Sequence, residues 1–498
     1  MRFLLTLVVA LAGAGLPACA ARIATPAGSG TTNAPAPFDH ALPGDVDRLL
    51  DDAALAHALI AVRVESLRDG RLLYARNSDT RMIPASSLKI ITAAVAGERL
   101  GWGHRFETRL DAVGRVQNGV LDGDLIVVGS GDPAIMADGM RAAPLFDEWA
   151  ALLQQAGITR VDGRLIGDDT AFDDEPLGAG WAWDYLTAPY AAPSGALSYN
   201  ENLVQVRVMP GASAGAPASV SVGPAGHGLT VDNRVTTATP DAAPSIVFDR
   251  LPGSMTLTVR GQVPADGGIH LRATTVANPT TFFVEGLRVA LAARGITVTG
   301  GAWDIDDAVT AGTDEASRRA ITIHRSAPLS SLVAQMMKLS QNYYGEMLIK
   351  AIGRLDGQRG STDSGRQVVR QALEAWDLPV DGLVMYDGSG LSRYNYATAD
   401  LLVGVLRHAW QSDVMRGPFA AALPVAGHDG TLGSRMHAAL RRRVQAKTGT
   451  IANVRALAGF AESSNGEKLV FAMIANHFTA PNADVDAVME RVLERILR

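Results

Sequence analysis

The sequence predicts an α/β (α+β) fold in which an antiparallel sheet is flanked by helices and interrupted by a long β-rich insertion. Apolar residues recur at helical spacing over residues 86–100 and again after Ile321. Between about Trp102 and Gly300 the pattern changes to short alternating strands, Asp-Gly turns and loops rich in Pro, Ala and Gly. Because helical segments lie on both sides of that stretch, we interpret it as an insertion into one layered core.

The core is predicted to begin with a hairpin and a helix. Two β-prone runs between His57 and Arg76 are joined by Asp69-Gly70, a strong turn signal. Pro84-Ala85-Ser86 then opens a helical run with Gly101 just after its end. These features predict a sheet followed by a helix that carries Ser86 in its first turn.

The insertion and the C-terminal part supply the remaining predicted elements. The strands of the insertion show clear alternation in LVQVRVMP, SIVFDR, MTLTVRGQV and IHLRATTV. The later helical patterns are LSSLVAQMMKL, YYGEMLIKAIGRL and RQVVRQALEAW. Strands are predicted around VQAKTGTI, VRALAGFAES and KLVFAMIANHF, before an amphipathic helix from about Asp484 to Arg498.

Composition excludes several classes of protein. The 498 residues include 45 Lys and Arg against 51 Asp and Glu, a net charge of −6, so the basic face of a nucleic-acid-binding protein is missing. A hydrophobic fraction of 47% with 19% charged residues excludes wholesale disorder. A single cysteine excludes a disulfide scaffold, and the length suggests about three domains at roughly 150 residues each.

The N-terminus predicts export. An apolar run over residues 3–16 follows Arg2; it is short for a membrane span and typical of a signal peptide, which we assign to residues 1–20. Residues 21–38 are rich in Pro, Gly, Ser, Thr and Ala, which predicts a flexible linker. The rest of the chain is therefore expected in a periplasmic or other extracytoplasmic space.

The only cysteine allows two interpretations of this leader. Leu16-Pro17-Ala18-Cys19 fits a lipobox, in which Cys19 becomes the lipidated first residue of a membrane-anchored lipoprotein. In the alternative, Ala18-Cys19-Ala20 is the small-residue site of an ordinary signal peptidase, and no lipid anchor follows.

Lysine is rare in this chain, and its placement points to chemistry. Only five of the 45 basic residues are lysines, so each of them calls for an explanation. Lys89 lies three residues after Ser86, a spacing that places amine and hydroxyl on one helix face. A lysine can deprotonate a serine only when its amine is neutral, which burial and a second cation favour by lowering its pKa. Lys447 is a candidate for that second cation.

Two further motifs follow in a characteristic order. Ser340-Gln341-Asn342 lies at the break between two helical patterns, and Lys447-Thr448-Gly449-Thr450 lies in a predicted strand. Ser-x-x-Lys, Ser-x-Asn and Lys-Thr-Gly in this order form the signature of penicillin-binding proteins and serine β-lactamases. Ser198-Tyr199-Asn200 also fits the second motif, but it lies inside the insertion, so we prefer Ser340.

With Ser340 lying 254 positions after Ser86, the sequence resembles peptidase family S13, the D-alanyl-D-alanine carboxypeptidase/endopeptidases that are class C low-molecular-mass penicillin-binding proteins. The resemblance covers roughly residues 40–498. Further stretches that resemble the family are VVGSGDPAI, GDDTAFDDEPLGAGWAWDY, YDGSGLSRYN, LPVAGHDGTLGSRM and AKTGTIANVRALAGF.

The resemblance implies a serine β-lactamase/DD-peptidase-like fold with two inserted domains. The transpeptidase-like catalytic domain would comprise residues 39–100 and 320–498. The inserted region, 101–319, would form two smaller domains: about 101–200 together with 280–319, and about 201–279.

The resemblance also implies a role for each motif residue. Ser86 would be the acylated nucleophile and Lys89 its general base. Ser340 and Lys447 would relay the proton to the leaving D-alanine, and Asn342 would hold the substrate amide and the Lys89 side chain.

The same resemblance implies the groups that bind substrate. The N–H groups of Ser86 and Thr450 would form the oxyanion hole, and Thr448-Gly449-Thr450 would bind the terminal carboxylate together with Lys447. Asp169, or its neighbour Asp168, would meet the amino group of a diaminopimelyl side chain.

The function expected from these features is a cofactor-free serine DD-peptidase. It would cleave D-Ala-D-Ala termini, and in addition cross-links, of peptidoglycan peptides, with β-lactams as covalent inhibitors. No His-Glu-x-x-His or comparable spacing predicts a metal site. The alternatives are a β-lactamase and a non-catalytic wall sensor. Trp181-Ala182-Trp183 is interpreted as packing, with a sugar-stacking platform as the alternative.

Overall fold

The computed structural model describes residues 39–308, 317–355 and 357–498. The predicted signal peptide with Cys19 and the predicted linker 21–38 lie outside the described residues. Residues 41–498 form one compact unit. In the described part of the chain, no helix combines the length and the apolar character that crossing a membrane requires.

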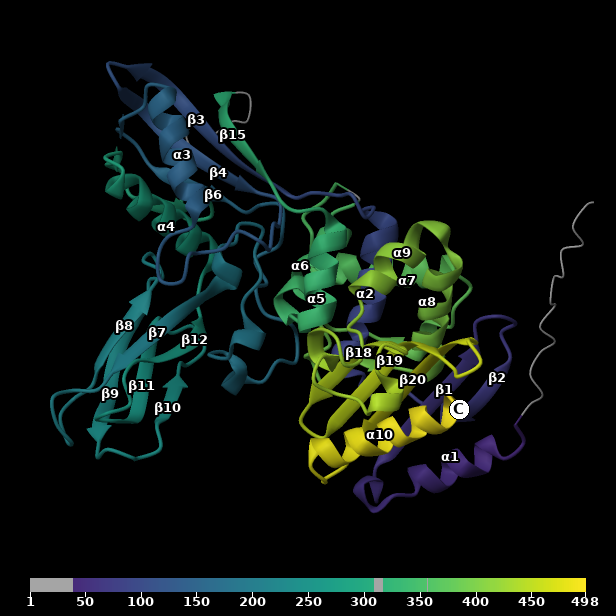
Figure 1. Cartoon of the computed structure of the whole chain (residues 1–498). Helices are drawn as coiled ribbons and strands as arrows, with labels where there is room; N and C mark the ends of the chain where they lie inside the picture. The colour runs from purple at the N-terminus through teal and green to yellow at the C-terminus, as the bar shows by residue number, and fades with distance from the viewer. Residues whose placement is uncertain (1–38, 309–316, 356) are drawn as a thin grey trace, which may run out of the picture. The chain divides into compact units, whose positions relative to one another are not determined.

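A five-stranded antiparallel sheet forms the centre of the part of the chain outside the predicted insertion (Figure 1). Its order is β18-β19-β20-β1-β2, so both ends of the sequence meet in one sheet. The predicted N-terminal hairpin is confirmed, and Gly70 takes a positive φ of 74° in its turn. The strands are β1 (Leu59–Ser66), β2 (Leu72–Arg76), β18 (Val444–Ile451), β19 (Val454–Glu462) and β20 (Lys468–Asn476).

Helices cover both faces of this sheet. On one face, α1 (Leu42–Leu50) and α10 (Asn482–Ile496) pack against each other and against the strands. The other face is covered by helices that surround α2. They are α2 (Lys89–Arg99), α5 (Leu329–Leu339), α6 (Asn342–Gly353), α7 (Thr362–Ala375), α8 (Ala399–Gln411) and α9 (Asp413–Ala422). The predicted sandwich of helices and an antiparallel sheet is thereby confirmed.

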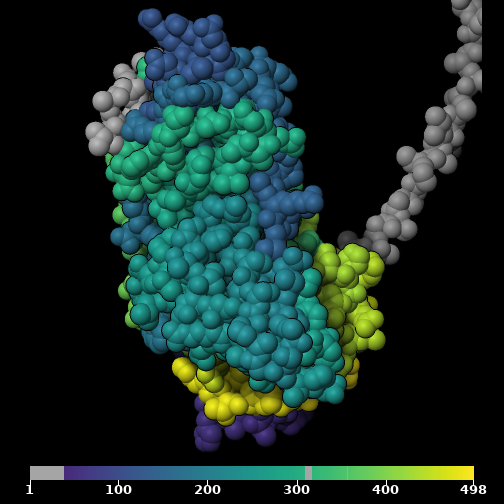
Figure 2. All heavy atoms as spheres, turned by 90° about the vertical axis from the view of Figure 1, so that its left-hand side faces the viewer, coloured from purple at the N-terminus to yellow at the C-terminus, as the bar shows by residue number. Residues whose placement is uncertain are grey.

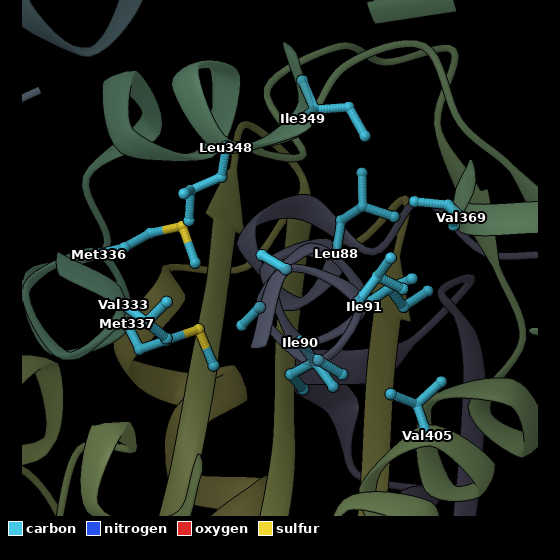
Figure 3. Packing of buried hydrophobic residues seen from close by; sticks show 14 of the residues in the cluster. Leu88, Ile90, Ile91, Val333, Met336, Met337, Leu348, Ile349, Val369 and Val405 are labelled. Atoms are coloured by element: carbon cyan, nitrogen blue, oxygen red, sulfur yellow. The ribbon is translucent and has the colours of Figure 1, made fainter. Parts of the chain in front are cut away.

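Helix α2 is buried over Lys89–Gly97 because it is the centre of this second layer. Ile90 and Ile91 are fully buried among side chains from α5 to α8, including Met336, Val369 and Val405 (Figure 3). Full burial of such a side chain stabilises the fold by roughly 1.5–3 kcal/mol. The turn before α2 is therefore held on a rigid support.

The described residues of the predicted insertion form three further sheets. A seven-stranded sheet is covered by α3 (Pro144–Gln155) and α4 (Pro279–Ala293), and β15 pairs antiparallel with β3. Its strands are β3 (Glu107–Gln117), β4 (Val120–Gly129), β5 (Arg160–Val161), β6 (Leu165–Asp168), β13 (Thr297–Val298), β14 (Ala302–Asp304) and β15 (Arg319–Arg325). This sheet thus extends past residue 319, the predicted end of the insertion; the domain boundaries stay predictions.

The other two sheets of the insertion have three strands each, in the orders β12-β7-β8 and β10-β11-β9. Teal atoms of this part cover much of the face turned to the viewer in Figure 2. Their bounds are β7 (Leu203–Met209), β8 (Ser219–Gly223), β9 (Thr230–Ala238), β10 (Ser245–Asp249), β11 (Thr256–Pro264) and β12 (His270–Thr275). A two-stranded ribbon, β16 (Leu383–Val384) with β17 (Tyr396–Ala397), completes the strands.

Candidate active site

Ser86 lies in a 3-10 turn, η2 (Ala85–Leu88), which leads directly into α2 at Lys89. The turn begins with Ala85 at φ 46°, a conformation that costs a non-glycine residue roughly 1–2 kcal/mol. Two glycines allow the backbone to approach so closely: a Cβ on Gly390 would lie 1.9 Å from the Ala85 carbonyl oxygen, and one on Gly449 would lie 2.6 Å from that of Pro84. Packing around η2 therefore holds the strained turn in place.

Lys89 is completely buried at the base of this turn and makes three hydrogen bonds. Its Nζ donates to Ser86 Oγ at 2.9 Å, to Asn342 Oδ1 at 2.7 Å and to the Ser389 carbonyl at 2.7 Å. Burial lowers the pKa of Lys89 to about 7, although the nearby Asp387 and Glu346 carboxylates oppose that shift. A substantial fraction of Lys89 is consequently neutral near pH 7.

Ser340 and Lys447 form a second pair. Ser340 ends α5 in the left-handed conformation, at φ 60°, between α5 and α6. Lys447 Nζ donates to Ser340 Oγ at 2.8 Å and to the Thr448 carbonyl at 2.8 Å. Burial, and then the charge of Lys89, lower the pKa of Lys447 well below its usual value. The second motif thus lies at the predicted interruption between the two helices.

One cavity of about 490 Å³ joins the predicted motifs. Ser86, Ser340, Asn342 and Thr450 all line it. Strand β18, which carries Lys447 and Thr450, is at the edge of the sheet and packs on η2. The structure therefore brings all three predicted motifs to one cleft.

Of the three residues expected to bind the terminal carboxylate together with Lys447, one is exposed and two are buried. Thr450 is exposed in the cleft, and its hydroxyl accepts a hydrogen bond from Arg455. Thr448 is buried, with its hydroxyl donating to Thr431 Oγ1 at 2.8 Å. Gly449 is buried against the η2 backbone. Because Gly449 has no side chain, β18 can approach the η2 turn that carries Ser86. Gly449 itself is not among the residues that line the cleft.

Asp169 is not among the residues that line this cleft, so its expected contact with the substrate stays a prediction. It follows β6 and accepts a hydrogen bond from the Thr280 hydroxyl of α4, so it faces a separate cavity in the insertion. Its carboxylate lies within 4.8 Å of those of Asp174 and Asp306. Burial first, and then the neighbouring carboxylates, raise its pKa to about 6. Asp168 is paired with Arg318 Nη1 at 2.9 Å.

Two tyrosines of the insertion line the cleft and were missed by the motif reasoning. The rings of Tyr185 and Tyr190 contact each other edge to face at 5.4 Å. Asn342 Nδ2 donates to the Tyr190 carbonyl at 2.9 Å, which ties the Ser-x-Asn segment to the insertion. The only signal for Tyr185 was the family-like stretch that ends in Trp183-Asp184-Tyr185, and Tyr190 lies just beyond it.

The loop over residues 387–391 is the second feature that the motifs did not indicate. Asp387 is fully buried and accepts hydrogen bonds from the Gly390 and Ser392 N–H groups and from Trp181 Nε1, at 2.7, 2.6 and 2.9 Å. Glu346 of α6 accepts from the Gly388 N–H at 3.1 Å, and burial raises its pKa to about 8. Both acids thus fix the loop whose Ser389 carbonyl contacts Lys89.

The comparisons with known proteins agree with this architecture. The family described as "D-Ala-D-Ala carboxypeptidase 3 (S13) family" matches residues 42–496. The chain is 35% identical over 472 residues to a D-alanyl-D-alanine carboxypeptidase of Actinomadura sp. (strain R39), covering 90% of this chain and 84% of that protein. It is 28% identical over 421 residues to D-alanyl-D-alanine carboxypeptidase DacB of Haemophilus influenzae, covering 83% and 85%.

A solved structure gives the same result for the fold. Penicillin binding protein 4 (dacB) from Haemophilus influenzae superposes with a TM-score of 0.81 at 25% identity, covering 91% of this chain and 99% of that one. The match includes the insertion as well as the sheet and helices around Ser86. From the family match over nearly all described residues, the chain belongs to the D-Ala-D-Ala carboxypeptidase 3 (S13) family.

Proposed function

We propose that this protein is a serine DD-peptidase that removes the terminal D-alanine of peptidoglycan peptides through an acyl-enzyme on Ser86. The observation that carries the proposal is the pair of contacts Lys89–Ser86 and Lys447–Ser340 around one cleft. Family membership and the names of the relatives support the same activity.

Acylation begins when neutral Lys89 takes the Ser86 proton. The freed Oγ attacks the carbonyl carbon of the penultimate D-alanine, so the C–O bond forms and a negative charge develops on the carbonyl oxygen. The Ser86 and Thr450 N–H groups would stabilise that charge, and loss of one such donor typically costs about 3 kcal/mol. Asn342 holds the Lys89 amine in place at 2.7 Å.

Collapse of this intermediate breaks the C–N bond and releases D-alanine. The leaving nitrogen needs a proton, which Ser340 delivers from its hydroxyl while Lys447 replaces it. Thr450, which is exposed in the cleft, offers its hydroxyl to the terminal carboxylate of the substrate. Because burial lowers the pKa of Lys447, a carboxylate bound nearby would favour its protonated form, which then attracts that carboxylate and can return a proton to Ser340. A water molecule then hydrolyses the ester and regenerates Ser86.

The same acylation step accounts for inhibition by β-lactams. The β-lactam amide opens on attack by Ser86 Oγ, and its nitrogen stays attached to the acyl group, so nothing leaves the cleft. A cross-link between two peptides contains the same type of bond after a D-alanine carbonyl, so we extend the proposal to endopeptidase action.

Intact-mass spectrometry with benzylpenicillin tests the proposal on a chain starting at Arg22. We expect a long-lived adduct on Ser86 that Ser86→Ala abolishes. Ser87→Ala is the matched control, because the neighbouring Ser87 hydroxyl is buried without a partner among the described residues. Release of D-alanine from a pentapeptide ending in D-Ala-D-Ala is then measured directly.

Two outcomes would replace the proposal. Consumption of the penicillin without an adduct would identify a β-lactamase. Untouched penicillin together with an uncleaved pentapeptide would identify a non-catalytic binding protein.

We extend the proposal to location, with export and lipidation at Cys19. Both rest on the leader sequence alone. Fractionation of cells that express the full chain tests them: Cys19→Ala releases the protein from the membrane fraction if Cys19 carries the lipid, and leaves its distribution unchanged if ordinary signal peptidase cleaves.

A further inference from the structure

A second cavity, of about 430 Å³, lies next to the active-site cleft within the insertion. One wall is η3 (Trp183–Tyr185), and the opposite wall is formed by the end of β10, the start of β11 and the loop between them. Its lining combines Trp183, Phe248 and Leu251 with carboxylates and hydroxyls. The proposed reaction at Ser86 uses none of these residues.

The apolar part of this cavity is open to solvent. Trp183 is 68% exposed and Leu251 is 70% exposed, an unusual state for two large apolar side chains that share one cavity. Trp181 differs, since its Nε1 donates to the buried Asp387. The packing role expected for Trp181-Ala182-Trp183 therefore applies to Trp181, whereas the indole nitrogen of Trp183 has no hydrogen-bond partner within residues 39–308, 317–355 and 357–498.

The polar part of the cavity supplies hydrogen-bonding groups around that indole. Asp184 contributes a carboxylate and Ser254 a hydroxyl, whereas the Asp249 carboxylate in the same lining accepts a hydrogen bond from Arg260 Nε. Arg250 uses Nη2 to donate to the Leu186 and Val276 carbonyls, while its Nη1 has no partner among the described residues. Carboxylates, hydroxyls and a guanidinium whose Nη1 is buried thus share one lining with an aromatic ring.

This combination matches a pyranose ring. A sugar ring has an apolar face of C–H groups that stacks on an indole and a rim of hydroxyls that bonds to carboxylates and hydroxyls. An acetamido group adds one N–H donor for a carboxylate and one carbonyl acceptor for a guanidinium. An amino sugar with an acetamido group would satisfy both parts of the lining.

The position of the cavity indicates the molecule that carries the sugar. Trp183 and Asp184 line the second cavity, and the next residue, Tyr185, lines the cleft that contains Ser86. Tyr185 contacts Tyr190, whose carbonyl accepts from Asn342, so the two cavities share one wall. In peptidoglycan the peptide is covalently attached to a glycan of acetamido sugars.

We infer that this second cavity binds the glycan of the same peptidoglycan strand whose peptide is cleaved at Ser86. The inference rests on the proposed DD-peptidase function and adds a substrate class to it. Binding at both cavities makes the second contact intramolecular, which raises affinity for the glycan-linked peptide above that for the free peptide.

The test compares two substrates, the free pentapeptide and the same pentapeptide on its disaccharide of acetamido sugars. We expect kcat/KM to be about tenfold higher for the disaccharide form, the size of effect typical of one aromatic stacking contact with its hydrogen bonds. Trp183→Ala and, separately, Leu251→Ser should reduce that ratio toward one. Trp303→Ala is the matched control, since Trp303 is 42% exposed on β14 and should keep the ratio.

Each remaining result overturns the inference in a distinct way. Equal kcat/KM for both substrates in the unmodified protein means that the glycan is not recognised. An unchanged ratio in both cavity variants places glycan recognition elsewhere, and an equal loss on both substrates assigns the cavity to the peptide. Failure of the proposed function is separate: neither substrate would be cleaved and benzylpenicillin would leave no adduct.

Discussion

Lys89 combines complete burial with a contact to the nucleophile, and this fixes its protonation behaviour. Its pKa is lowered to about 7 because burial disfavours the charged form. The neutral amine is the base, so acylation should rise with pH through about 7 and level off above it. Below that pKa the rate constant should fall about tenfold per pH unit. Stopped-flow acylation by a chromogenic cephalosporin between pH 5.5 and 8 checks this; a flat profile would contradict the assignment.

Glu346 should alter the protonation of Lys89 without contacting the substrate. Only the ionised form of Glu346 favours protonated Lys89, and its pKa of about 8 means that this form is populated mainly at the upper end of the pH series. Glu346→Gln should therefore increase the fraction of neutral Lys89, and with it the acylation rate, near pH 8 and leave the profile below about pH 7 unchanged. The same pH series on the variant measures this increase. Glu201→Gln is the control, because Glu201 accepts from Gln341 at 2.7 Å and is no cause of the Lys89 shift. Superimposable profiles for Glu346→Gln and the unmodified protein would rule out the effect.

The sequence predicted those site residues whose contacts depend on nearby positions or on a known motif. Ser86 and Lys89 are neighbours on one turn, so their contact followed from spacing alone. Glu346 and Asp387 act on Lys89 from segments far along the chain, and nothing in their local sequence distinguishes a buried acid from a solvated one. Asp169 illustrates the same limit: several acids are close in sequence, and only the packing of α4 on β6 determines which way each one faces.

At the scale of elements, the loop over residues 387–391 and the η2 turn fit together only because Gly390 has no side chain. Gly390→Ala should lower the melting temperature and slow acylation, since its φ is +87° and the added Cβ would lie 1.9 Å from the Ala85 carbonyl oxygen. Gly466→Ala is a matched control with φ +82° and no atom within 4 Å of the added Cβ. It should lose only the conformational term, about 1 kcal/mol, and keep its acylation rate.

Calorimetry and the acylation rate separate the two variants. Equal losses of stability, with unchanged acylation in both, would show that the contact between the loop and η2 does not position Ser86. The elements themselves were largely predictable, because helices such as α5 have strong periodicity and strands such as β19 are short, nearly continuous apolar runs. The 3-10 turn at Ser86 was not, since it depends on packing against β18 and the Gly390 loop.

At the scale of the whole molecule, the insertion is connected to the active site by side chains. Trp181 Nε1 donates to Asp387 at 2.9 Å, and Gln341 Nε2 donates to Glu201 at 2.7 Å. Trp181→Phe should leave part of the buried Asp387 carboxylate without a donor, at a cost of about 1–3 kcal/mol, and should slow acylation through the Lys89 contact. Trp376→Phe, which removes an indole donor to the exposed Glu98, is the comparison.

Thermal unfolding and penicillin acylation of both variants provide the measurement. A Trp181→Phe protein that acylates at the normal rate would mean that the insertion does not support the catalytic loop.

The sequence located the insertion by its change from helical to strand patterns, but it gave no sign of these contacts. They join residues more than a hundred positions apart, which local periodicity cannot reveal.

The Lys89–Asn342 contact spans 253 positions, and the third motif lies on β18, near the end of the chain. Contacts of such long sequence separation form late, because the loop-closure entropy must be overcome first. Synthesis begins at the N-terminus, so Ser86 is made early. At that stage it lacks the amide of Asn342 and three of the five strands of its sheet. The nucleophile therefore gains its reactivity only when the segment from β18 to α10 has folded onto the sheet and turn around Ser86, and chains cut short before β18 are expected to carry no active serine.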